Sequence, residues 1–268
     1  MNRIEVVMLA GLVVTLLLLI MYILFMVRGI ESLGTHNSST GEVIHLPPPK
    51  KITEMSVEES ILHRRSVREF AVDPLKFEHF SMILWSAFGI TEPRQELRAS
   101  PSAGATYPME VYVVVGEKSV EIKGGLYLEA GVYKYDPFTH SIKLMKKGDF
   151  RRDLASAALG QQWVEEAPIN IVICAVFERT TRVYGKRGEI RYVPMEVGHA
   201  GQSIYLMSTA LGYGTVAVGA FYDEQVARVV SVARDEVPLY IMPVGVPKRP
   251  YRGSFEELEK YLEANRRG

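Results

Sequence analysis

Ile169-Asn170-Ile171-Val172-Ile173-Cys174-Ala175-Val176 is the stretch of sequence that decides the fold class, because every residue in it except Asn170 is apolar. A strand with one face in water alternates apolar and polar residues, and this stretch does not alternate. It is therefore predicted to be a buried central strand whose sheet is covered on both faces. Cys174 lies in the middle of this apolar run, so we interpret it as a buried structural thiol.

Three other runs share this continuous apolar character and are also predicted as buried strands: Val111 to Val115, Thr215 to Val218, and Leu239 to Val246. Helix signals lie before, between and after these strands. Ser56-Val57-Glu58-Glu59 is a capping box, and Asp73-Pro74 predicts the first turn of a helix that runs to about Phe88.

Two further helices are predicted later in the chain. Between Glu196 and Leu211, apolar residues recur at three- and four-residue spacing, and another helix is predicted to start at Asp223. Helices combined with buried strands predict an α+β fold of three layers, in which a mixed central sheet is covered by helices.

The composition excludes several classes of function. The chain has 268 residues, with 31 basic and 31 acidic side chains, so its charge indicates no nucleic-acid partner. Cys174 is the one cysteine, which excludes an internal disulfide framework and a multi-cysteine zinc or iron–sulfur site within one chain.

The N-terminal region divides into two predicted segments. Residues 4–27 are almost continuously apolar and long enough to cross a bilayer, and they lack the small residues of a cleavage site. They predict a single-pass membrane anchor, but Arg3 and Arg28 flank it on both sides and leave its orientation open. Residues 28–51 are predicted to be a stalk or linker, residues 52–250 the folded domain, and residues 251–268 a charged helical tail.

Arg64-Arg65-Ser66-Val67-Arg68-Glu69-Phe70 is a candidate phosphate site. In an extended conformation, Arg64, Ser66 and Arg68 project to one face and place two guanidinium groups around a hydroxyl. A solvated basic turn between two helices is the alternative interpretation.

Three other segments combine small or basic residues with the end of a predicted strand: Ser100-Pro101-Ser102-Ala103-Gly104-Ala105-Thr106-Tyr107-Pro108, Val218-Gly219-Ala220-Phe221, and Pro243-Val244-Gly245-Val246-Pro247-Lys248-Arg249. The first lets backbone approach a planar ligand, the second offers backbone N–H donors, and the third supplies cations. Each segment taken alone is also compatible with an ordinary loop or turn.

These blocks, in this order, resemble the FMN-dependent nitroreductase family, and within it the SagB-type dehydrogenase branch. The resemblance runs from about Ile61 to Arg249 and includes Gly198-His199-Ala200-Gly201-Gln202 and Gly212-Tyr213-Gly214-Thr215. It implies a nitroreductase-like fold and a homodimer with FMN at the subunit interface. It also implies hydride transfer through flavin N5 between a donor such as NAD(P)H and a small organic substrate.

The resemblance assigns roles to individual residues. The implied FMN-binding residues are Arg64, Arg65, Ser66, Arg68, Pro101, Ser102, Ala103, Gly104, Gln202, Gly219, Ala220, Lys248 and Arg249. The branch carries a Lys-Tyr pair before the long helix, where this chain reads Val183-Tyr184-Gly185. Tyr184 therefore remains as a proton donor, and the missing lysine argues against peptide azoline oxidation.

Two functions remain open at this point. One is a membrane-anchored, FMN-dependent oxidoreductase, and the other is a non-catalytic flavin-binding or scaffold protein that retains the fold. Glu196-x-x-His199 has the spacing of di-iron ligands, but the sequence contains no second pair, so we predict no metal site. The motifs of hydrolases, P-loop NTPases, zincins and Rossmann enzymes are absent from the sequence.

Overall fold

The structure is a computed structural model that describes residues 41–266. A seven-stranded sheet forms its centre, with the strand order β1-β9-β8-β5-β10-β12-β11. These strands are β1 (Val43–His45), β5 (Met109–Val115), β8 (Gly131–Asp136), β9 (Ser141–Lys147), β10 (Ile169–Ala175), β11 (Gly214–Thr215) and β12 (Val237–Gly245).

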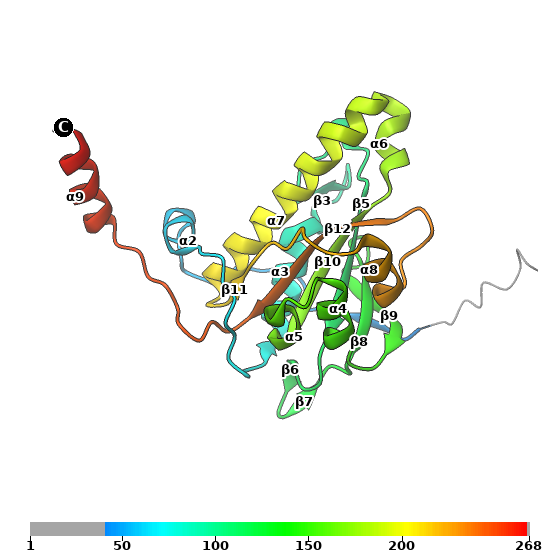
Figure 1. Cartoon of the computed structure of the whole chain (residues 1–268), viewed down its shortest axis with the longest axis horizontal. Helices are drawn as coiled ribbons and strands as arrows, with labels where there is room; N and C mark the ends of the chain where they lie inside the picture. The colour runs from blue at the N-terminus through cyan, green and yellow to red at the C-terminus, as the bar shows by residue number, and fades with distance from the viewer. Residues whose placement is uncertain (1–40, 267–268) are drawn as a thin grey trace, which may run out of the picture. The chain divides into compact units, whose positions relative to one another are not determined.

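Helices and short strands surround this sheet (Figure 1). The helices are α2 (Val57–His63), α3 (Phe77–Phe88), η1 (Ala103–Ala105), α4 (Arg151–Ala157), α5 (Gln162–Glu166), α6 (Phe177–Tyr184), η2 (Gly188–Tyr192), α7 (Val193–Ala210), α8 (Asp223–Val230) and α9 (Phe255–Arg266). The short strands are β2 (Leu75–Lys76), β3 (Ile90–Glu92), β4 (Leu97–Arg98), β6 (Val120–Lys123) and β7 (Leu126–Tyr127).

Strand β10 lies at the centre of the fold, as its sequence predicts. It pairs with β5 on one side and with β12 on the other, and all seven of its residues are buried. Alternate residues point to opposite faces of a strand. Ile171 packs into a core formed with α3 and α7, whereas Val172 packs into a core formed with α4, α5 and α8.

The predicted three-layer α+β arrangement is confirmed by these two cores, which lie on opposite faces of one sheet. Figure 1 shows the long helix α7 crossing the sheet. The prediction of a mixed sheet is wrong, because every ladder between the seven strands is antiparallel. A continuous apolar run indicates that both faces of the sheet are covered, but it does not indicate whether neighbouring strands are parallel or antiparallel.

Two boundaries differ from the sequence prediction. Helix α3 begins at Phe77 and not directly after Asp73-Pro74, because Leu75 and Lys76 form β2 and pair with β6. The sequence predicts a stalk or linker over residues 28–51, but β1 within this range pairs with β9, and Leu46 is buried. The folded domain therefore includes residues assigned to the linker.

Other predicted elements are confirmed. The Ser56 capping box opens α2, and α8 starts at Asp223. Helix α7 contains most of the helix predicted for residues 196–211 and starts three residues earlier, at Val193. The predicted tail contains α9, none of whose side chains is buried.

The predicted membrane anchor, residues 4–27, lies outside the described residues. Across residues 41–266, no helix combines the length and the apolar character needed to cross a bilayer.

We expect Val172→Ala to lower the free energy of unfolding by about 2 kcal/mol, because it removes two methyl groups from a closely packed core. Val72→Ala is the matched control, since Val72 is fully exposed and its truncation leaves no cavity. Urea unfolding of the two variants measures the difference. Equal stabilities would contradict the assignment of β10 to the core.

Candidate active site

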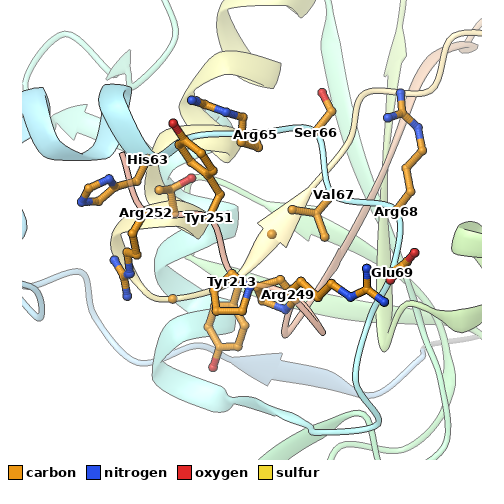
Figure 2. A pocket seen from close by; sticks show the side chains of 15 residues that line it. His63, Arg65, Ser66, Val67, Arg68, Glu69, Tyr213, Arg249, Tyr251 and Arg252 are labelled. Carbon is orange, nitrogen blue, oxygen red and sulfur yellow. The ribbon is translucent and has the colours of Figure 1, made fainter. Parts of the chain in front are cut away.

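A cavity of about 300 Å³ lies where the segment after α2 meets the segment after β12. Its walls are strongly basic, with five basic side chains and one carboxylate: His63, Arg65, Arg68, Arg249, Arg252 and Glu69. Figure 2 shows Arg65 and Arg68 on either side of Ser66. This arrangement predicts binding of an anion that accepts several hydrogen bonds.

Backbone pairing holds the two walls of the cavity together. The amide of Val67 donates to the carbonyl of Thr215 at 2.9 Å, so residues 66–67 lie beside β11. Gly214 permits this approach, because a Cβ atom there would lie 2.5 Å from a methyl carbon of Val67. On the other wall, the amide of Lys248 donates to the carbonyl of Glu69 at 3.0 Å and keeps Arg249 next to this segment.

Two guanidinium groups of the cavity lie against aromatic rings, and that of Arg65 also donates to the backbone carbonyls of Leu62 and Arg64. Arg65 lies 3.6 Å from the centre of the Tyr251 ring, and Arg68 lies 5.5 Å from the Trp163 ring. Within residues 41–266, neither these two arginines nor Arg249 and Arg252 form an ion pair with a carboxylate. Their positive charge is therefore available to a ligand.

Of the implied FMN-binding residues, Arg65, Ser66, Arg68 and Arg249 line this cavity together. Arg64 does not line the cavity but lies 5.1 Å from the ring centre of Tyr205. Lys248 is also outside the lining, although its backbone joins the two walls. Arg252 also lines the cavity, although its position in the sequence places it in the charged tail.

The second predicted segment, residues 101–104, lies beside Tyr184. Gly104 has φ +61°, and a Cβ atom there would come within 2.6 Å of the Tyr184 hydroxyl. Only glycine combines that backbone conformation with such a close neighbour. The structure therefore places the candidate proton donor Tyr184 against the segment expected to face the flavin.

Helix α7 connects the basic cavity to residues 217–220. The hydroxyl of Tyr205 accepts a hydrogen bond from the amide of Ala217 at 2.8 Å and lies 3.0 Å from the Ser66 hydroxyl. The sequence analysis does not single out Tyr205, because its two hydroxyl contacts lie far from it along the chain. The predicted ligands Gln202, Gly219 and Ala220 are exposed. Among the described residues, the amides of Gly219 and Ala220 donate no hydrogen bond.

Glu196 is a buried carboxyl on α7, with 2% of its surface exposed. Burial raises its pKa to about 7, while the Ser102 hydroxyl and the charge of Arg98 act in the opposite direction. The folded chain thus holds this proton more tightly than the unfolded chain. The stability it contributes is lost as the pH rises from about 4.5 to about 7.

His199 is exposed and does not share the environment of Glu196. In the part of the chain that the structure describes, no group of three or more His, Cys, Asp or Glu side chains is arranged to hold a metal ion. Cys174 is fully buried, and burial raises the pKa of its thiol, so its interpretation as a structural thiol is confirmed.

The model of the nitroreductase family matches residues 61–246, most of the described domain. The chain belongs to the nitroreductase family. A relative from Methanocaldococcus jannaschii, provisionally named as a nitroreductase, is 45% identical over 205 residues, which are 76% of this chain and 98% of the relative. The Escherichia coli microcin B17-processing protein is 25% identical over 174 residues, which are 64% of this chain and 62% of that protein.

A solved structure agrees with this assignment. A provisionally named nitroreductase of Ralstonia eutropha has a TM-score of 0.66 and 27% identity, over 79% of this chain and 92% of that one. The predicted membership of the nitroreductase family, with its SagB-type branch, is confirmed. As a member of this family, the chain is an oxidoreductase.

Tyr205→Phe removes the acceptor of the Ala217 amide, and we expect it to lower the free energy of unfolding by about 1–2 kcal/mol. Tyr222→Phe is the control, because the Tyr222 ring is exposed. Thermal or urea unfolding measures both variants. A Tyr205→Phe protein as stable as the control would mean that the Tyr205 hydroxyl does not stabilise the connection between Ser66 and residues 217–220.

Proposed function

We propose that this nitroreductase is an FMN-dependent oxidoreductase that transfers a hydride between a donor such as NAD(P)H and a small organic acceptor. The basic cavity is the observation that carries the proposal. It holds four arginines without carboxylate partners among the described residues, beside the hydroxyl of Ser66. Such a donor set fits the phosphate of a nucleotide, because guanidinium groups match phosphate oxygens in charge and geometry.

The remaining ligands fit the other end of an elongated cofactor. Residues 101–104 and the amides of Gly219 and Ala220 present exposed or partly exposed backbone and small side chains, which suit the face and edge of a planar ring. Bound FMN would supply two-electron transfer at N5. Tyr184, which lies against Gly104, would donate a proton to the acceptor.

We expect the flavin to lie between two copies of the chain. Met195, His199 and Gln202 are exposed on the same side of α7, which otherwise packs on the sheet. A face of this kind on the longest helix suits contact with a second subunit. In that homodimer, residues 101–104 would approach the flavin bound mainly by the partner subunit.

The decisive experiment is the visible absorption spectrum of the purified protein with added FMN, before and after NADPH or NADH is supplied under nitrogen. Flavin bands that bleach would establish both the cofactor and the donor. Flavin bands that persist would leave a flavoprotein with another donor or without catalysis. A protein that takes up no FMN would contradict the proposal.

The phosphate site makes a more specific prediction. Arg68→Ala and Arg249→Ala should each raise the Kd for FMN about 10- to 100-fold, because each removes a charge-assisted hydrogen bond worth about 1.5–3 kcal/mol. Arg182→Ala is the control, since Arg182 is exposed on α6 and pairs with Glu178. Flavin fluorescence titration measures all three variants. An unchanged Kd in both cavity variants would place the phosphate elsewhere.

Membrane attachment is a separate part of the proposal and rests on the hydropathy of residues 4–27. We expect the full chain to sediment with membranes in high salt and to be released by detergent. A variant that starts at Gly41 should remain in the supernatant. Sedimentation that does not depend on residues 1–40 would contradict the anchor.

A further inference from the structure

Glu196 occupies an unusual position for an acidic residue. It lies in the first turn of α7 and is 2% exposed, and its Oε1 atom is buried without a hydrogen-bond partner in the described chain. Buried carboxyls are normally paired or fully hydrogen-bonded. A carboxyl that keeps one oxygen unsatisfied therefore requires a reason beyond packing.

The groups that face Glu196 leave its charge only partly compensated. Ser102 faces it from the start of η1, and Arg98 faces it from β4. Arg98 does not form an ion pair with it within residues 41–266, and its guanidinium group lies 4.1 Å from the Phe88 ring centre and 4.4 Å from that of Tyr107. The Nε atom of Arg98 is also buried without a partner.

More distant charges act mainly on Arg98. Glu110 and Arg179 affect the guanidinium in opposite directions, and they pair with each other. On α7 itself, His199 is exposed one turn further along. The protonation of Glu196 is therefore governed by its burial, by the hydroxyl of Ser102 and by the charge of Arg98.

Ser102 connects this carboxyl to the proposed flavin site. Its Oγ accepts a hydrogen bond from the amide of Tyr107 at 2.9 Å, which fixes the turn containing Gly104, and Gly104 contacts Tyr184. Glu196 thus lies behind the segment expected to face the flavin ring. In a buried, low-dielectric environment, its charge would be felt by a ligand on the other side of that segment.

We propose that Glu196 is a redox-linked proton site, a positioning residue that takes up a proton when the bound flavin is reduced and releases it on reoxidation. The inference rests on the proposed function. A hydride from NAD(P)H adds negative charge to the site, and a proton from water then neutralises the nearby carboxylate. When the hydride leaves for the acceptor, Glu196 would release its proton to solvent, while Tyr184 would protonate the acceptor and regain a proton from solvent. The flavin thus gains and loses one hydride, and Glu196 gains and loses one proton, in each cycle.

A purely structural role makes different predictions. If Glu196 only fills space and donates a hydrogen bond while permanently protonated, replacing it with glutamine changes flavin properties equally at every pH, or not at all. A redox-linked site behaves differently, because glutamine imitates the protonated form alone. Its effect then appears only where the wild-type carboxyl is ionised.

The test is a potentiometric titration of the FMN-loaded full chain and of Glu196→Gln, at about pH 5.5 and about pH 8.5, below and above the raised pKa of about 7 of this carboxyl. We expect the two proteins to coincide at the lower pH. At the higher pH, Glu196→Gln should favour reduced flavin about tenfold more than the wild type, a shift of about 30 mV for two electrons. Glu178→Gln, which removes an exposed carboxylate, is the control and should match the wild type at both values.

A second readout follows protons directly and does not require turnover. Photoreduction of the bound flavin in weakly buffered solution with an indicator dye should show greater proton uptake by the wild type than by Glu196→Gln near neutral pH. Glu196→Asp should restore part of this difference. Ser102→Ala removes a group that lowers the pKa of Glu196, so the uptake profile should move to higher pH.

The outcomes separate the two proposals. Flavin that binds and is reduced, with the same potential and proton uptake in wild type and Glu196→Gln at both pH values, would overturn the role of Glu196 and leave the proposed function intact. A shift of equal size at both pH values would overturn it as well, in favour of a structural role. A wild-type chain that binds no FMN would overturn the proposed function and this inference with it.

Discussion

The pairing of β10 with β5 and β12 is the interaction on which the rest of the structure depends. Strands β5 and β12 satisfy the backbone hydrogen bonds on both edges of the buried strand β10, and the apolar side chains of β10 must be covered on both faces of the sheet. Helices α3 and α7 cover one face, and helices α4, α5 and α8 cover the other. The length and position of α7 follow from this requirement.

The candidate site lies at the edge of the sheet, next to β11 and β12. β11 and the segment after β12 extend the edge of the sheet, and residues 66–71 pair with both. Backbone hydrogen bonds thereby hold several cations close together, although the cations repel one another. Aromatic rings beneath Arg65 and Arg68 offset part of this repulsion through cation–π contacts. An anion in the cavity would offset the remainder.

Helix α7 carries one residue next to the basic cavity and another next to residues 101–104. Tyr205, near its C-terminal end, contacts Ser66 in the proposed phosphate-binding segment, while Glu196, in its first turn, lies next to Ser102. Nine residues of helix separate them, about 13.5 Å along the axis. The same helix that completes the core therefore sets the relation between a positively charged region and a buried carboxyl. Any movement of α7 against the sheet would alter both.

The sequence by itself determined three of the four buried strands that it predicts, most helices and the family. Thr215 to Val218 is the exception, because strand β11 covers only Gly214–Thr215. Apolar runs, capping residues and glycines act locally. The strand at Ile169 to Val176 and the helix start at Ser56 can therefore be predicted without any knowledge of distant contacts. The order of the basic and small-residue blocks was sufficient to indicate the family. It also offered Arg65, Ser66, Arg68 and Arg249 as candidate FMN-binding residues, because guanidinium and hydroxyl groups suit phosphate, and these four share one cavity.

Only the tertiary structure decided strand direction, the place of β1 in the sheet, and which arginines share a cavity. Arg64 and Arg68 look equivalent in the sequence, yet one lies over Tyr205 and the other lines the cavity. The environments of Tyr205 and Glu196 could not be predicted from the sequence either. Their burial and their hydrogen-bond partners depend on residues far apart along the chain. A sequence pattern indicates which side chains lie on a helix or strand. The environment of those side chains depends on how the helices and strands pack together.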